Sequence, residues 1–94
     1  MIGRIYIIKN DLNDKVYIGS TKEPISRRFS KHKYDMKRKH SKLYKAFEQL
    51  GIDCFYIEQL EEIEVEDMAQ LRSIECEYIM HYDTKHNGYN TRLS

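Results

Sequence analysis

Residues 4–19, with the sequence RIYIIKNDLNDKVYIG, decide the fold of this chain. β-branched and aromatic residues fill 4–9, turn-forming residues occupy 11–14, and a second run of strand-forming residues follows at 15–19. Two such runs separated by a short polar turn are typical of a β-hairpin. The stretch therefore predicts two adjacent antiparallel strands close to the first residue.

The length of the hairpin loop decides where the two tyrosines of this stretch point. With an even loop, such as four residues at 11–14, Tyr6 lies opposite Gly19 and Ile8 lies opposite Tyr17. All four then lie on one face of the sheet, whereas an odd loop would place Tyr6 and Tyr17 on opposite faces. The even loop is preferred because it needs no bulge.

Alternating helix and strand patterns occupy the rest of the chain. Pro24 fits the first turn of a helix that runs toward Lys37, and Ser41 and Gly51 fit the start and stop of a second helix. A third strand is predicted at 54–60, a third helix at 66–82 and a turn at Asn87-Gly88. The expected core residues of the helices are Ile25, Phe29, His32, Met36, Leu43, Tyr44, Phe47, Leu50, Met68, Leu71, Ile74, Tyr78, Ile79 and Tyr82. The order β-β-α-α-β-α predicts an α+β fold around a small, mainly antiparallel three-stranded sheet.

Length and composition limit the classes of protein. Ninety-four residues are expected to form one domain, 1–94. No apolar run approaches the roughly 20 residues of a membrane span, and no signal peptide is visible. Only Cys54 and Cys76 occur, without a C-x-x-C pair. These features favour a reduced, intracellular protein of the cytoplasm that does not bind membranes.

The small net charge of +1 hides a strong asymmetry along the chain. Residues 1–47 contain 13 of the 16 Lys and Arg, whereas 48–94 contain 11 of the 15 Asp and Glu. Ten basic residues fall within 21–45, a density that suits a phosphate backbone but also an ordinary solvated helix face. The acidic half would repel a polyanion unless it faced away. The candidate DNA-binding residues are Lys22, Arg27, Lys31, Lys33, Lys37, Arg38 and Lys39.

Glu75 interrupts the apolar side of the third predicted helix. It lies four residues after Leu71 and four before Ile79, whereas Glu66 and Glu77 lie on the solvated side. An inward carboxylate needs a cation, a hydrogen-bond donor or a metal. The competing interpretation is a partly exposed glutamate at the margin of the apolar stripe.

Several short motifs, each uninformative alone, occur in one specific order. In chain order they are Arg4-Ile5-Tyr6, Tyr17-Ile18-Gly19, Arg28 with His32 one turn later, Glu75, and Asn87-Gly88-Tyr89-Asn90. In this combination the chain resembles the GIY-YIG nuclease domain family, and most closely the catalytic domains of phage-type homing endonucleases. The likeness runs from Arg4 to Asn90. The family's first glycine is replaced by Arg4, with Gly3 one position earlier.

The resemblance implies roles for individual residues. It implies a catalytic set of Tyr6, Tyr17, Arg28, His32, Glu75 and Asn90, with Gly19 and His40 as auxiliary residues. It implies DNA as substrate and a divalent metal bound by Glu75. One carboxylate cannot build a two-metal site, so a single Mg²⁺ or Mn²⁺ is expected. A tyrosine with an ordinary pKa near 10 is a poor base, so its surroundings must favour the phenolate. Tyr6 is preferred as the base, with Tyr17 orienting the water or the phosphate.

Two other classes of protein fit parts of the same pattern. A non-catalytic nucleic-acid-binding module would use the basic stretch 21–45 and let the tyrosines pack or stack on bases. A protein-interaction domain would pair its basic and acidic halves with each other or with a partner. For a nuclease, one active site cuts one strand, so a dimer, sequential nicks or a separate DNA-reading partner all stay open.

Overall fold

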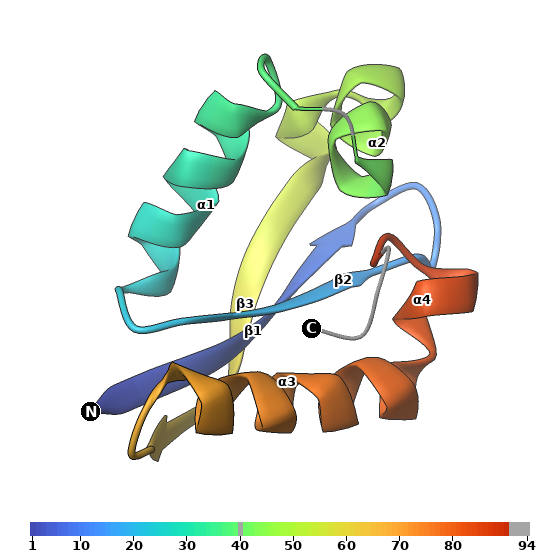
Figure 1. Cartoon of the computed structure of the whole chain (residues 1–94). Helices are drawn as coiled ribbons and strands as arrows, with labels where there is room; N and C mark the ends of the chain where they lie inside the picture. The colour runs from blue at the N-terminus through green and yellow to red at the C-terminus, as the bar shows by residue number, and fades with distance from the viewer. Residues whose placement is uncertain (40, 91–94) are drawn as a thin grey trace.

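A computed structural model describes residues 1–39 and 41–90 of the chain (Figure 1). Three antiparallel strands form one sheet in the order β2-β1-β3. The strands are β1 (Ile2–Asn10), β2 (Tyr17–Thr21) and β3 (Phe55–Glu64). The helices are α1 (Ile25–Asp35), α2 (Lys42–Leu50), the 3₁₀ turn η1 (Ile52–Cys54), α3 (Met68–Tyr82) and α4 (Thr84–Asn87). This arrangement confirms the predicted α+β fold, to which it adds η1 and α4.

The hairpin register is the one predicted for an even loop. Tyr6 pairs with Gly19 and Ile8 pairs with Tyr17. The loop is six residues long rather than four, because the side chain of Asn10 organises it. Asn10 Oδ1 accepts hydrogen bonds from the backbone N–H groups of Leu12 (2.8 Å) and Asn13 (2.9 Å). β2 therefore begins at Tyr17 instead of Lys15, but the loop stays even and the tyrosines keep their common face.

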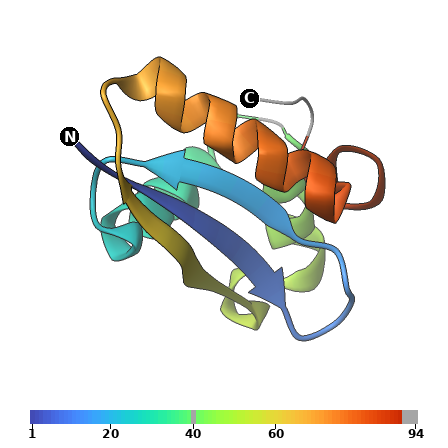
Figure 2. The same cartoon turned by 90° about the horizontal axis from the view of Figure 1, so that it is seen from below.

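Helices cover both faces of the sheet (Figures 1 and 2). α1 and α2 pack on the face that carries Tyr6 and Ile8, and the buried Phe47 and Phe55 complete that core. α3 packs on the opposite face. The buried core residues on that side are Ile5, Ile7, Ile18, Val65, Leu71 and Ile79. β1 is covered on both sides, which explains why it reads as a nearly continuous apolar run.

The ends of the helices differ slightly from the sequence-based bounds. α2 begins after Ser41, whose hydroxyl accepts a hydrogen bond from the Tyr44 N–H, and it ends at Gly51 with φ 92°, as predicted. α1 ends at Asp35 rather than Lys37, with Pro24 as the residue that precedes its first turn. α3 begins at Met68 rather than residue 66, because Asp67 is its N-cap and accepts a hydrogen bond from the Gln70 N–H.

Two other sequence-based expectations need correction. β3 runs to Glu64, past the predicted end at residue 60, because its second half continues to pair with β1 as far as Ile2. Tyr82 was expected in the core but is 42% exposed at the last position of α3. None of the helices described within 1–39 and 41–90 has the length and apolarity needed to cross a membrane.

Candidate active site

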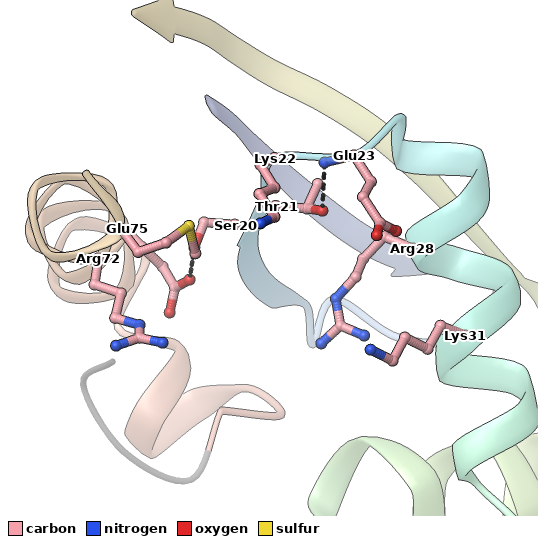
Figure 3. A pocket seen from close by; sticks show the side chains of 9 residues that line it. Ser20, Thr21, Lys22, Glu23, Arg28, Lys31, Arg72 and Glu75 are labelled. Carbon is pink, nitrogen blue, oxygen red and sulfur yellow. Dashed lines mark hydrogen bonds between the residues drawn. The ribbon is translucent and has the colours of Figure 1, made fainter. Parts of the chain in front are cut away.

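A hollow of about 710 Å³ opens beside the end of β2, between α1 and α3 (Figure 3). Its lining residues are Ser20, Thr21, Lys22, Glu23, Arg28, Lys31, Met68, Arg72 and Glu75. Arg28 and Lys31 point into it from α1, and Arg72 and Glu75 point into it from α3. β2 is an edge strand of the sheet, and its last residues, Ser20 and Thr21, line the hollow, so side chains from both faces of the sheet meet there.

Tyr6, Tyr17 and His32 form a packed aromatic group on the α1 face of the sheet. The ring centroids of Tyr6 and Tyr17 are 6.3 Å apart, and His32 lies 6.0 Å from Tyr6 and 5.4 Å from Tyr17. The Tyr6 hydroxyl and His32 Nε2 are hydrogen-bonded at 2.8 Å. The structure thus brings together three of the predicted site residues. Gly19 is required beneath them, because a Cβ at position 19 would collide with the end of the Tyr6 ring.

Tyr44 is a member of this group that sequence reasoning placed only in the core. Its hydroxyl is hydrogen-bonded to His32 Nδ1 at 2.9 Å. Both ring nitrogens of His32 are therefore occupied by tyrosine hydroxyls, one from β1 and one from α2. The sequence carried no signal for this contact, because it depends on how α1 and α2 pack against each other.

Burial changes the acid–base properties of the aromatic group. It raises the pKa of Tyr6 well above the ordinary value, and the charge of a neighbouring Tyr17 phenolate would raise it further, while Arg28 lowers it. Burial and then Glu75 raise the pKa of Tyr17 to about 12, against the lowering effect of Arg28. Burial, Arg28 and Lys31 lower the pKa of His32 to about 3. At neutral pH the group therefore consists of two neutral phenols and a neutral imidazole.

The two tyrosines differ in their access to solvent. Tyr6 is 0% exposed, whereas Tyr17 is only half-buried. Part of Tyr17 therefore stays accessible to solvent, whereas no part of Tyr6 does. This difference bears directly on which hydroxyl can meet an attacking water.

Glu75 points inward, as its sequence position suggested. Side chains alternate along β2, so that Tyr17 and Gly19 face α1 while Ile18 and Ser20 face α3. The Ser20 hydroxyl donates a short hydrogen bond to Glu75 Oε1. Burial raises the pKa of Glu75, while the Ser20 hydrogen bond, Arg72 and Arg28 lower it. The carboxylate is half-buried at the lip of the hollow, which explains why a charged side chain can occupy the otherwise apolar side of α3.

Asn90 lies away from the hollow and braces β2. Its side-chain Oδ1 accepts a hydrogen bond from the Ile18 N–H at 2.9 Å, and its Nδ2 donates to the Ile18 carbonyl at 2.9 Å. The Tyr89 N–H donates to the Val16 carbonyl at 2.9 Å. These bonds pair the free edge of β2 as a fourth strand would, and Asn90 is 4% exposed. It supports the strand that carries Tyr17 rather than facing the hollow.

The predicted DNA-binding residues are all exposed, but only two of the seven reach the hollow. Lys22 and Lys31 line it, whereas Lys39 lies 3.9 Å from the Asp35 carboxylate. Lys33 lies over the Phe29 ring. The remaining three are Arg27, Lys37 and Arg38. His40, the second auxiliary residue, falls outside the described residues.

Arg72 is a residue of the hollow that the sequence analysis missed. It precedes Glu75 by three residues, so both lie on the same side of α3, and it lowers the pKa of Glu75. Its spacing from Glu75 was a usable signal. With Arg28 on the opposite wall, the hollow presents two guanidinium groups to a bound anion.

The donor set of the hollow fits a single hard cation. Among residues 1–39 and 41–90, no three His, Cys, Asp or Glu side chains gather into a metal-binding group. Glu75 can supply one carboxylate, with substrate oxygens and water as the remaining ligands. A cation beside it would also relieve the burial cost that raises the pKa of this carboxyl.

Comparison with known proteins identifies the family of the chain. The family model described as GIY-YIG catalytic domain matches residues 2–90. Uncharacterized protein 019R of Invertebrate iridescent virus 6 is 44% identical over 92 residues, which are 95% of this chain and 33% of that protein. Intron-associated endonuclease 1 of Enterobacteria phage T4 is 39% identical over 89 residues, 92% of this chain and 35% of that protein. The chain spans about a third of the length of these relatives.

Solved structures give the same result at the level of the fold. The catalytic domain of the intron endonuclease I-TevI, as an E75A mutant, superimposes with a TM-score of 0.86 and 34% sequence identity. The superposition covers 100% of this chain and 97% of that one. Nucleases of this family generally depend on a divalent metal. Sequence and fold together show that this chain belongs to the GIY-YIG catalytic domain family and is a nuclease domain.

Proposed function

We propose that the domain is a DNA endonuclease that hydrolyses phosphodiester bonds with one bound Mg²⁺ or Mn²⁺. The observation that carries the proposal is that Arg28 and Glu75 line one hollow and that both lie close enough to the half-buried Tyr17 to shift its pKa. Each supplies one requirement of the reaction. The phosphate must be held, its developing charge must be neutralised, and a water must be positioned and deprotonated.

Arg28 and Arg72 are the groups proposed to hold the phosphate. A guanidinium offers planar, paired donors that match two phosphate oxygens, and the two side chains approach from opposite walls. Lys22 and Lys31 extend the positive rim of the hollow along the backbone of the nucleic acid. The other five basic residues of the predicted set stay candidates for more distant phosphates.

Glu75 is the residue proposed to bind the metal, which would act as a Lewis acid at the leaving oxygen. Ser20 holds the carboxylate in place through Oε1. The presence of this carboxylate in a basic hollow argues against a module that only binds nucleic acid. An uncompensated negative charge would repel the phosphates that Arg28 and Lys31 attract.

Tyr17 is proposed to contact the attacking water, because solvent reaches it and does not reach Tyr6. This differs from the sequence-based preference for Tyr6, and the physical reason is the complete burial of Tyr6. Tyr17 accepts a proton from water while its own hydroxyl proton passes to a Tyr6 phenolate behind it. Arg28 favours the phenolate form of both residues. Asn90 contributes by holding the strand that carries Tyr17.

Cleavage of supercoiled plasmid DNA tests the proposal. We expect nicked or linear product with Mg²⁺ or Mn²⁺, and none with EDTA. Salt-sensitive DNA binding without cleavage under any of these conditions would point to a non-catalytic binding module instead. Plasmid and branched DNA compared side by side report on the preferred substrate.

A further inference from the structure

Three buried side chains form one continuous hydrogen-bonded chain behind the hollow. The Tyr6 hydroxyl is bonded to His32 Nε2 at 2.8 Å, and His32 Nδ1 is bonded to the Tyr44 hydroxyl at 2.9 Å. The exposed fraction rises along the chain, from 0% at Tyr6 through 2% at His32 to 8% at Tyr44. The chain therefore leads from a sealed hydroxyl to a residue that reaches the surface.

His32 cannot hold an extra proton at neutral pH, because burial, Arg28, Lys31 and Lys39 lower its pKa to about 3. A neutral imidazole has one N–H donor and one acceptor nitrogen. The two hydrogen bonds of the ring are therefore directional. Either Tyr6 donates to Nε2 while Nδ1 donates to Tyr44, or both bonds run the other way. Each arrangement satisfies every polar atom of the ring.

Charged groups shift the pKa values at the two ends of this chain in the same directions. At Tyr44, burial and the Asp35 carboxylate raise the pKa, and Arg28 lowers it. At Tyr6, burial and the negatively charged forms of Tyr17 and Glu75 raise the pKa, and Arg28 lowers it. Asp35 thus favours a Tyr44 that keeps a hydroxyl proton, as a relay residue must.

We propose that Tyr44 is the outer end of a proton relay that deprotonates Tyr6. The Tyr6 hydroxyl proton moves to His32 Nε2, the Nδ1 proton moves to the Tyr44 oxygen, and the original Tyr44 hydroxyl proton leaves to solvent water. His32 and Tyr44 are neutral before and after, and the net result is a Tyr6 phenolate plus one proton in solvent. The phenolate, held by Nε2–H, then accepts the proton from Tyr17.

The proposal deepens the endonuclease function proposed above and rests on it. Tyr44 is a positioning and relay residue rather than a catalytic one, because it acts through His32 and Tyr6. The relay requires the hydroxyl of Tyr44, whereas packing requires only its ring. A phenylalanine at position 44 would fill the same space among its aromatic neighbours but could neither donate to nor accept from Nδ1.

The test compares Tyr44→Phe with Tyr82→Phe, which removes the same atom from an exposed tyrosine at the end of α3. Single-turnover cleavage of plasmid DNA is measured with Mg²⁺ from pH 6 to 10. Tyr44→Phe should cleave at least tenfold more slowly than wild type at pH 7. The difference in cleavage rate should narrow toward pH 10, where hydroxide from solvent can act as the nucleophile and a Tyr6 phenolate is no longer needed. Tyr82→Phe should match wild type throughout.

A second readout does not depend on activity. Spectra of ¹⁵N-histidine-labelled protein should show His32 neutral from pH 5 to 8, and its Nδ1 signal should move in Tyr44→Phe but not in Tyr82→Phe. A wild-type His32 that titrates near its ordinary 6.5 overturns the relay, whatever the variants do. Equal cleavage rates for Tyr44→Phe and wild type across the pH range overturn the relay and leave the nuclease standing. A wild type that never cleaves DNA removes the proposed function and the relay with it.

Discussion

Ser20 and Glu75 are joined by a hydrogen bond that ties β2 directly to α3, 55 residues further along the chain. The Ser20 hydroxyl donates to Oε1, which fixes the carboxylate at the lip of the hollow. Ser20→Ala should leave the fold intact but raise the pKa of Glu75 further, because a hydrogen bond that lowers it is lost. We expect a higher Mg²⁺ concentration at half-maximal cleavage and little change at saturating Mg²⁺. Ser73→Ala, on the exposed side of α3, is the matched control. An unchanged Mg²⁺ dependence in Ser20→Ala would contradict the positioning role.

Glu75→Gln separates the metal-binding role of the carboxylate from a structural one. The variant should fold and should lose metal-dependent cleavage. In EDTA it should bind DNA at least as tightly as wild type, since one negative charge near the phosphates is gone. Normal cleavage by this variant would move the metal site elsewhere. Failure to fold would instead identify Glu75 as a structural residue.

The same substitution has a pH-dependent effect on stability. Burial raises the folded-state pKa of Glu75 above the ordinary 4.5, so folding favours the protonated form. That contribution is fully present below pH 4.5 and is lost as pH rises through the raised folded-state value. Metal-free Glu75→Gln should therefore melt at a higher temperature than wild type at pH 7, and the difference should disappear below pH 4. A difference of the opposite sign at pH 7 would mean that the ionised carboxylate is net stabilising.

Arg28 is expected to be needed as a guanidinium and not only as a positive charge. Arg28→Ala should remove most cleavage without unfolding the chain. Arg28→Lys should also be poor, because an ammonium cannot form the paired contacts of a guanidinium with phosphate. Arg27→Ala provides the control, since Arg27 is exposed and does not line the hollow. Cleavage by Arg28→Ala within a few-fold of the control would remove Arg28 from the site.

Tyr6→Phe and Tyr17→Phe should each lower the cleavage rate at least tenfold, which is about 1.4 kcal/mol of barrier. Their stabilities should differ. Tyr6→Phe leaves a buried nitrogen of His32 unpaired, at a cost of about 1–3 kcal/mol, whereas Tyr17 has no comparable bond with His32. Urea unfolding measures the difference. Wild-type rates in both variants would reduce the pair to packing residues.

Loss of the Asn90 side chain is expected to lower the stability of the folded domain rather than to act directly on the chemical step of cleavage. Asn90→Ala leaves the N–H and the carbonyl of the buried Ile18 without partners, at a cost of about 1–3 kcal/mol for each group. Asn87→Ala, which removes an exposed hydrogen bond to Asp83, is the control. Urea unfolding should rank Asn90→Ala well below Asn87→Ala. Equal stability of the two variants would argue that Asn90 has a role other than bracing β2.

Local sequence patterns predicted the fold well because strand register, helix caps and helix faces depend on residues that are close together in the chain. The predicted even loop placed Tyr6 and Tyr17 on one face, and the observed strand pairing has the predicted register although β2 begins two residues later than expected. Ser41 and Gly51 bounded α2 because their capping chemistry acts within one turn. The inward position of Glu75 followed from its spacing along α3.

These local patterns could not predict contacts between side chains of different helices and strands. The bond between His32 and Tyr44 depends on the relative placement of α1 and α2, which no periodicity encodes. The choice between Tyr6 and Tyr17 as the group that meets water required knowing which ring the packed helices seal. Asn90 was placed in the catalytic set by resemblance alone. Its hydrogen bonds to Ile18 show that it holds the edge of β2, a structural role that the sequence spacing did not reveal.

The bond between Ile18 and Asn90 also orders the events of folding. It spans 72 residues, so it closes one of the largest loops in the domain and forms at a high cost in chain entropy. The β-hairpin can form from neighbouring residues within microseconds, but its outer edge stays unpaired until residues 89–90 arrive. During synthesis, the ribosome must deliver nearly the whole domain before this edge is closed. Cleavage should therefore become possible only after Asn90 has left the ribosome, later than the tyrosines, Arg28 and Glu75.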